Sequence, residues 1–443
     1  MKFVSNKISL LAFSSLISSS AVAATYTYVG RWQIQEGPAW STAGLGQTNG
    51  RQAAAIKFGG SASDYVISTV SSDPTAINFK AYYVGWGVGR TLLDDNRAST
   101  GLYNCGSIGC SYSAWISDRR VDEFNYAFLV NLGPSATDTQ AALAITANRL
   151  RASYNKISAA SHFPTSNTYD CNLFDARGMC VSAGGRYTYA EGPHSHSTAG
   201  VVILGYKVSP SIRIGGFLDQ SVSNDAPTGI QISNKNPMMG AFVYWNQNPN
   251  ELGYQVKLAN TYQDKDLTLT RDAVGTSESG TGKTGLMTQS YVGELSYAFM
   301  YKENTLVRPY FGLRYTSINQ DAYTETGVTT PLTYNKLKDE TTAALMGVKV
   351  KHQLTEKTTL TGSLGVEQDI DHKVGNFVAT GLSGLTSENF SGGTRHNTRS
   401  LASFGAYYSI AKSQRLSGEV MFQQLPFQNS IGGTVYANYM IGF

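Results

Sequence analysis

The chain has 443 residues, of which 35 are lysine or arginine and 31 are aspartate or glutamate, so its formal net charge is +4. Charged residues make up 15% of the chain, against roughly 25% in a typical soluble domain, which excludes a coiled coil or a charged disordered protein. A charge so close to neutral provides no electrostatic footprint for nucleic acid. The 45 glycines and 27 tyrosines instead favour an all-β protein, and a membrane barrel is one such class.

Residues 1–24 have the organisation of a secretory signal peptide. Lys2 and Lys7 form a positive n-region, a short apolar run extends from Ile8 to Ile17, and Ala21-Val22-Ala23 supplies a small-residue cleavage signal. We therefore expect an exported protein, most simply of bacterial origin.

The four cysteines fall into two close pairs, Cys105 with Cys110 and Cys171 with Cys180. An even number of cysteines in an exported protein favours disulfides, and local pairing within each pair is the expected one of the three possible connectivities. A zinc site is the alternative, but the chain offers neither a CxxC spacing nor a nearby pair of histidines.

Residues 25–132 form a first block, in which short apolar and aromatic runs alternate with turn signals. This spacing predicts a small β-rich, sandwich-like domain. The run Ala53–Phe58 could equally begin a helical turn, because it opens with three alanines. The block holds four of the five tryptophans: Trp32, Trp40, Trp86 and Trp115. We interpret them as core residues of the small domain, with a sugar-binding face as the alternative.

Residues 133–170 form a linker, and its segment 136–162 predicts a helix because it contains neither glycine nor proline. Thr137 or Asp138 can cap its start, and Pro164 ends it. The segment is polar, rich in small residues and weakly amphipathic. We therefore expect it to lie in a polar channel rather than to anchor a hydrophobic core.

From Met179 to the C-terminus the chain alternates apolar and polar residues, which predicts strands with two different faces. Many of these segments reach the roughly 9–11 residues that a tilted membrane strand requires. Twelve strands are predicted, near residues 179–190, 199–208, 210–219, 237–247, 250–270, 286–301, 304–320, 339–353, 356–370, 397–411, 413–425 and 430–443. The predicted fold is therefore a 12-stranded antiparallel transmembrane β-barrel over residues 171–443, with a helix in its lumen.

The lengths of the connections support the barrel. Short turns alternate with long polar connections at 220–236, 271–285, 321–338 and 371–396, and only the last connection on the long side, near Pro426–Asn429, is predicted to be short. An outer-membrane barrel shows this alternation, with the short turns on the periplasmic side.

The same alternation assigns side chains to the two faces of the wall. Tyr291 and Leu295 are predicted to face lipid, whereas Glu294, Arg308 and Arg314 are predicted to face the lumen, because charges are costly against lipid. Our hypothesis is that the cations of the helix pair with carboxylates of the wall. The cations are Arg149, Arg151 and Lys156, and the carboxylates are Glu294, Glu367 and Glu419.

Residues 136–443, with a polar helix, about twelve strands and a terminal strand Val435–Phe443, resemble an autotransporter of the type V secretion pathway. The resemblance implies a C-terminal barrel in the bacterial outer membrane and a helix that threads it. It also implies that residues 25–132 are a passenger domain exposed at the cell surface. The terminal alternation, with Tyr439, Ile441 and Phe443, resembles the signal read by the outer-membrane β-barrel assembly machinery. Outer-membrane lipid and that machinery are thus the implied partners.

Residues 25–132 also loosely resemble the extracellular domains of PEP-CTERM-sorted proteins. The resembling stretches are TYTYVGRWQI, GPAW, AAAIKFGGSASDYVISTV and INFKAY. The sorting tail of that family is absent, and the predicted barrel stands in its place.

The sequence contains no motif that we assign to catalysis, a cofactor or a metal. His194-Ser195-His196 is interpreted as part of a loop, because the other four histidines are distant in sequence. We therefore expect an autotransporter that is not an enzyme and needs no cofactor, whose passenger binds a surface ligand, a glycan or a protein. The alternatives are a porin-like channel with a periplasmic N-terminal domain and a surface enzyme with an unrecognised site.

Overall fold

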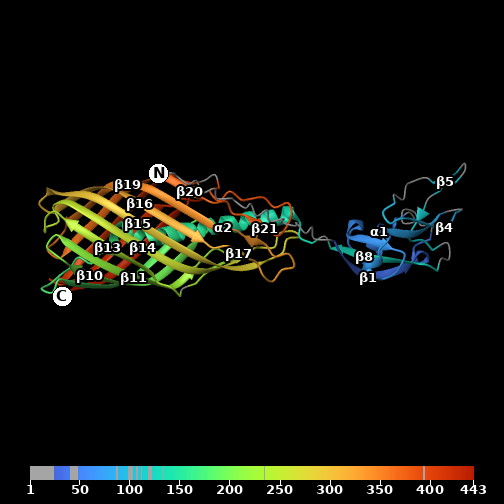
Figure 1. The fold of residues 1–443 in the computed structure, drawn as a ribbon, viewed down its shortest axis with the longest axis horizontal. Helices are drawn as coiled ribbons and strands as arrows, with labels where there is room; N and C mark the ends of the chain where they lie inside the picture. The colour runs from blue at the N-terminus through green and yellow to red at the C-terminus, as the bar shows by residue number, and fades with distance from the viewer. Residues whose placement is uncertain are drawn as a thin grey trace, which may run out of the picture. The chain divides into compact units, whose positions relative to one another are not determined.

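The computed structural model describes residues 24–39, 48–85, 88–97, 103–105, 108–110, 112–117, 122–131, 133–233, 235–392 and 395–443. The signal-peptide residues 1–23, Trp40 and Trp86 lie outside these ranges. The chain forms two compact units that divide between Ser135 and Ala136 (Figure 1).

The N-terminal unit is built from small antiparallel sheets. One sheet has the order β1-β8-β2 and consists of β1 (Thr25–Gln33), β8 (Phe124–Asn131) and β2 (Tyr65–Ser68). A second has the order β4-β3-β7 and consists of β4 (Val88–Asp94), β3 (Lys80–Gly85) and β7 (Tyr112–Ser113). The short strands β5 (Tyr103–Cys105) and β6 (Ile108–Cys110) pair with each other.

Helix α1 (Gly50–Phe58) contains the run Ala53–Phe58, for which the sequence left strand and helix open. The cause is local. The Asn49 side chain accepts a hydrogen bond from the Gln52 amide at 2.8 Å, and the Gln52 side chain accepts one from the Asn49 amide at 2.9 Å. This reciprocal capping box satisfies two amides that the first helical turn leaves unpaired.

The core of this unit lies between its sheets and α1, and it contains Trp32, Tyr83 and Ala114. The Trp32 side chain is fully buried, and its indole N–H donates to the Ala114 carbonyl at 3.0 Å. The partly buried Trp115 packs against the same core. Both tryptophans are therefore core residues, although only Trp32 has an acceptor for its indole N–H, since the Trp115 Nε1 atom is buried without one.

The C-terminal unit is a closed antiparallel barrel (Figure 1). In the part of the chain that the structure describes, twelve strands form its wall. They are β9 (Met179–Ala190), β10 (Ser195–Lys207), β11 (Ile212–Asp225), β13 (Met238–Asn246), β14 (Gly253–Thr270), β15 (Thr281–Lys302), β16 (Thr305–Gln320), β19 (Leu337–Gln353), β20 (Thr358–Val374), β22 (Thr398–Ala411), β23 (Gln414–Gln424) and β24 (Ile431–Gly442). All twelve correspond to predicted strands.

Closure requires that the first and last wall strands pair. β24 pairs antiparallel with β9 from Gly432 opposite Ala190 to Gly442 opposite Cys180. Every backbone group of the wall therefore has a neighbouring strand, as a bilayer demands.

Several strands are much longer than a membrane crossing. β15 has 22 residues and β14 has 18, against the roughly 9–11 that span the hydrocarbon. Their extra length lies on the side of the long connections, which add β12 (Ile230–Ile232), β17 (Tyr323–Thr324), β18 (Thr333–Tyr334) and β21 (Ala379–Thr380). One detail of the loop prediction was wrong. The first connection on this side is only four residues, Glu191 to His194, because β10 begins earlier than its apolar pattern suggests.

The two faces of the wall have the predicted register. Tyr291 and Leu295 are exposed on the outside, whereas Glu294, Arg308 and Arg314 are buried on the inside. The last strand shows the same alternation, with Val435 exposed and Thr434 and Asn438 buried, and Phe443 directly after it is exposed as well. Among the described helices, none combines the length and apolarity needed to span a membrane.

Tyr310 lies across two glycines on the inner face of the wall. It pairs with Gly347 in β19, and Gly347 pairs with Gly365 in β20. A Cβ atom at Gly347 would lie 2.7 Å from the Tyr310 hydroxyl, and one at Gly365 would overlap it. The tyrosine can cover the neighbouring strands only because both positions lack a side chain.

We predict that Gly365→Ala destabilises the barrel by about 1–3 kcal/mol, the usual cost of overpacking. The matched control is Gly362→Ala in the same strand, where a Cβ atom would make ordinary contact at 3.6 Å. The measurement is urea unfolding of the refolded barrel. The folded fraction at each urea concentration is read from electrophoretic mobility in samples that have not been boiled. Equal midpoints for the two variants would contradict the packing argument.

Candidate functional site: a helix within a charged lumen

Helix α2 (Ala136–Phe163) runs inside the barrel (Figure 1), and every residue from Leu150 to Phe163 is buried. Its 28 residues correspond to a length of about 42 Å at 1.5 Å per residue, more than the ~30 Å hydrocarbon layer. The helix ends where Pro164 begins a final wide turn, as the sequence predicts. The helix therefore occupies the lumen from the long connections to the turn at Pro164.

Helix α2 contributes to a hydrophobic core from Leu143 to Ile157, contrary to the expectation that it would not anchor one. Leu143, Ala147, Leu150, Tyr154 and Ile157 form a stripe at helical spacing and are all buried in one apolar cluster. Their partners come from the extended strands and long connections: Ile230, Ile232, Leu267, Leu269, Leu286, Ile318, Tyr323, Leu332, Tyr334, Leu337, Phe377, Ala379, Phe390 and Phe427. The stripe is narrow, so it is recognisable only once these distant residues surround it.

Polar contacts also tie the helix to the long connections. Arg149 forms an ion pair with Asp272 at 2.7 Å, and this hydrogen-bonded contact lowers the pKa of the Asp272 carboxyl. Arg151 donates to the carbonyls of Phe390 and Asn389, at 2.8 and 2.7 Å. Lys156 donates to the Asn224 side chain at 2.6 Å. All three cations therefore bind the end of the barrel that carries the long connections.

The predicted pairing of these cations with wall carboxylates was wrong for Glu294 and Glu367. Glu294 pairs with Lys349 at 2.6 Å, and Glu367 pairs with Arg314 and with Arg399. Glu419 lines a cavity at the opposite end of the lumen from the long connections.

The reason for the different pairing is axial position. The wall charges face the turn after the helix, since Arg314 donates to the Ser166 hydroxyl at 2.9 Å and Lys257 donates to the Ser166 carbonyl at 2.8 Å. Lys156 precedes Ser166 by ten residues, which places it about 15 Å closer to the long connections along a helical path. The sequence assigns each residue to a face but does not fix its height in the lumen.

A buried ion pair holds the wall to the segment after the helix. Arg186 contacts both carboxylate oxygens of Asp219, at 2.6 and 2.9 Å, and both side chains are almost fully inaccessible. Tyr169 lies after α2 in the chain, and its hydroxyl donates to the same carboxylate at 2.5 Å. Three parts of the chain thus share one buried carboxylate, a residue that the sequence analysis did not single out.

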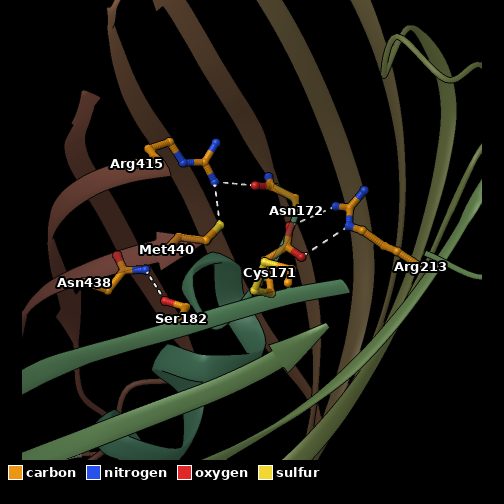
Figure 2. Close-up of a disulfide and its surroundings, with 9 residues drawn as sticks. Cys171, Asn172, Ser182, Arg213, Arg415, Asn438 and Met440 are labelled. Carbon is orange, nitrogen blue, oxygen red and sulfur yellow. Dashed lines mark hydrogen bonds and ion pairs between the residues drawn. A yellow bond between two sulfur atoms is a disulfide. The ribbon is translucent and has the colours of Figure 1, made fainter. Parts of the chain in front are cut away.

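The predicted local disulfide Cys171–Cys180 is present, with 5.7 Å between the two Cα atoms. It fixes the segment after the helix to β9, the first wall strand. Figure 2 shows Arg213 and Arg415 reaching this segment from two sides. Arg213 pairs with Asp170 at 2.9 Å, and Arg415 donates to the Asn172 side chain. The side chains of Cys105 and Cys110 lie outside the described residues, so that pairing stays a prediction.

Comparison with known proteins gives one family. The sequence profile of the autotransporter β-domain matches residues 181–421, slightly more than half of the chain. The autotransporter lipoprotein NalP of Neisseria meningitidis serogroup B is 34% identical over 98 residues, which are 21% of this chain and 9% of NalP. The chain thus spans a small part of this relative. The PEP-CTERM resemblance of residues 25–132 finds no support in these matches.

Solved structures of autotransporter barrels are also similar. The translocator domain of NalP from Neisseria meningitidis is 16% identical with a TM-score of 0.49, covering 70% of this chain and all of that domain. The transport unit of AIDA-I from Escherichia coli is 12% identical with a TM-score of 0.42, covering 67% of this chain and 99% of that unit.

We predict that Asp219→Asn lowers the stability of the barrel by about 3–5 kcal/mol, because it leaves the Arg186 charge buried without a carboxylate. Asp264→Asn is the control, since Asp264 is an exposed residue of β14. The temperature at which the folded band disappears from unboiled gels measures the difference. If Asp219→Asn has the same transition temperature as the parent chain, the Arg186–Asp219 pair is dispensable for stability.

A second prediction concerns the helix as a barrier to ions. Removing residues 25–162 deletes α2 except for its last residue, Phe163, whereas removing residues 25–135 leaves the helix in the lumen. In planar bilayers the shorter barrel should conduct severalfold more than the barrel that retains the helix, because only the latter is filled. Equal conductance of the two would mean that the helix does not close the pore.

Proposed function

This chain belongs to the autotransporter family and carries its translocator β-domain in the outer membrane. From this premise we propose that residues 25–132 are its passenger, held at the cell surface as a binding module by the helix and barrel. The single observation that carries the proposal is the filled lumen. Helix α2 is tied at its outer end to the long connections and at its inner end to the barrel wall.

Anchoring follows from these contacts. Withdrawing the helix would break the Arg149–Asp272 pair, expose the apolar stripe around Leu150 and pull against the disulfide at Cys171. Exposure of apolar side chains and separation of buried polar partners both cost free energy. We propose that the passenger therefore stays attached as long as the chain is intact.

A binding role is supported by aromatic residues on the surface of the N-terminal unit. On the β1-β8 sheet, Tyr28 lies against Tyr126 and Phe128, and the Arg31 guanidinium lies 4.1 Å from the centre of the Phe124 ring. Tyr28 is 38% exposed. Aromatic and arginine side chains are enriched where proteins bind partners. We propose this aromatic face, formed by Tyr28, Arg31, Phe124 and Tyr126, as the contact surface for a glycan or a protein.

A non-enzymatic role is part of the proposal. The acidic residues of the N-terminal unit that a glycosidase could use have structural partners, because Asp95 pairs with Arg51 at 2.9 Å and Glu123 pairs with Arg90. Asp95 also accepts from the Ile67 amide at 2.9 Å, and burial raises the pKa of its carboxyl. These contacts support structural roles for both residues.

We also propose that the β-barrel assembly machinery recognises the last strand. Its outward side chains Val435, Tyr439, Ile441 and Phe443 form one apolar face, and β24 closes the barrel against β9. A strand that closes the barrel and displays this face is suited to recognition before closure.

Protease accessibility on intact cells tests display. One epitope tag is inserted between Ser71 and Ser72, in an exposed connection of the N-terminal unit, and a control tag between Thr355 and Glu356, in the short β19–β20 turn. The first tag should be lost and the second retained, because short turns face the periplasm. Protection of the first tag until the outer membrane is permeabilised would favour the channel with a periplasmic N-terminal domain.

A further inference from the structure

The short-turn end of the lumen contains a cavity of about 170 Å³ that the proposed function does not use. Charged residues from several wall strands line it. The cations are Arg213, Arg308, Lys349, Lys351 and Arg415, and the carboxylates are Asp170, Glu251 and Glu419. We call this space the vestibule. Cations outnumber carboxylates in its lining, and charges enclosed by a protein wall are costly unless they are compensated.

The carboxylates near the vestibule are already engaged. Asp170 pairs with Arg213 at 2.9 Å, and Lys349 pairs with Glu294, which lies outside the lining. The Glu251 carboxylate forms ion pairs with two cations, Lys351 at 2.6 Å and Arg308 at 3.6 Å. Glu419 is the third lining carboxylate, so the five cations face four carboxylates when Glu294 is included, an excess of one positive charge.

Arg415 is one of these five cations. Its hydrogen bonds run to neutral acceptors, the Asn172 side-chain oxygen and the Met440 sulfur (Figure 2), and its guanidinium lies 4.7 Å from the centre of the Tyr407 ring. Among the described residues, the Nε atoms of Arg415 and Arg308 are buried without a hydrogen-bond acceptor. Buried donors of charged groups without acceptors are unusual, because each carries a desolvation cost.

We propose that the vestibule binds a compact tetrahedral oxyanion, inorganic phosphate, between Arg415, Arg308 and Lys351. Guanidinium groups present donors in a rigid planar fork that matches the spacing of phosphate oxygens. The volume is sufficient, since a water molecule occupies about 30 Å³ in the liquid and the vestibule holds the equivalent of several. The bound anion compensates the excess charge and accepts hydrogen bonds from guanidinium and ammonium groups of the residues that line the vestibule. This site is independent of the passenger and of its display.

Isothermal titration of the refolded full chain in detergent with sodium phosphate tests the proposal, at constant ionic strength maintained with sodium chloride. We expect saturable binding of one phosphate per chain, competition by sulfate and no displacement by chloride. Arg415→Gln and Lys351→Gln should each weaken binding about tenfold or more, the effect of losing one charge-assisted hydrogen bond. Lys357→Gln is the control, because Lys357 is exposed in the turn at the same end of the barrel.

Variants that fold are identified by electrophoresis, because a folded barrel migrates differently before and after boiling. If Arg415→Gln does not fold, Lys351→Gln decides, since Glu251 keeps Arg308 as a partner in that variant. The proposal is overturned if phosphate gives no saturable heat beyond that of chloride. It is equally overturned if the folded variants bind phosphate as tightly as the parent chain.

Discussion

The structure of the C-terminal unit depends on one constraint, that no backbone amide or carbonyl can face lipid without a partner. The wall meets it by pairing β24 with β9, so that the sheet has no edge. Closure then separates the two faces of every strand. Apolar side chains such as Leu295 and Phe311 face outward, and charged ones such as Arg314 face inward. The polar lumen is thus a consequence of closure rather than a separate feature.

The polar lumen is occupied by a segment of the same chain, helix α2. The inner part of α2 is small and polar, and the wall charges around its end satisfy the carbonyls of the final turn, as Lys257 does for Ser166. The outer part is different, because strands such as β15 extend beyond the membrane and enclose the apolar stripe around Leu150. A second apolar cluster, which contains Phe163, Tyr169 and Phe217, surrounds the inner end of the helix.

The charges of the lumen form separate groups rather than one continuous network. Asp219 joins the wall to Tyr169, Glu367 joins Arg314 to Arg399, and Glu251 joins Arg308 to Lys351. Each group places a carboxylate between donors from different parts of the chain, which ties those parts together. Arg415, with neutral hydrogen-bond partners, departs from this arrangement, and the vestibule next to it is where the lumen has room for an anion.

The sequence by itself determined the elements with local signals. Alternation defined the twelve wall strands and their faces, the absence of glycine and proline defined α2, and the spacing of Cys171 and Cys180 indicated their disulfide, because each signal depends on neighbours within a few residues. Only the tertiary structure decided which residues meet. The Arg149–Asp272 pair spans 123 positions, and the apolar stripe acquires meaning only when Phe390 and Phe427 cover it. Alternation has a period of two and fixes the side of a residue, whereas its height in the lumen depends on strand tilt and stagger, which are properties of the closed barrel.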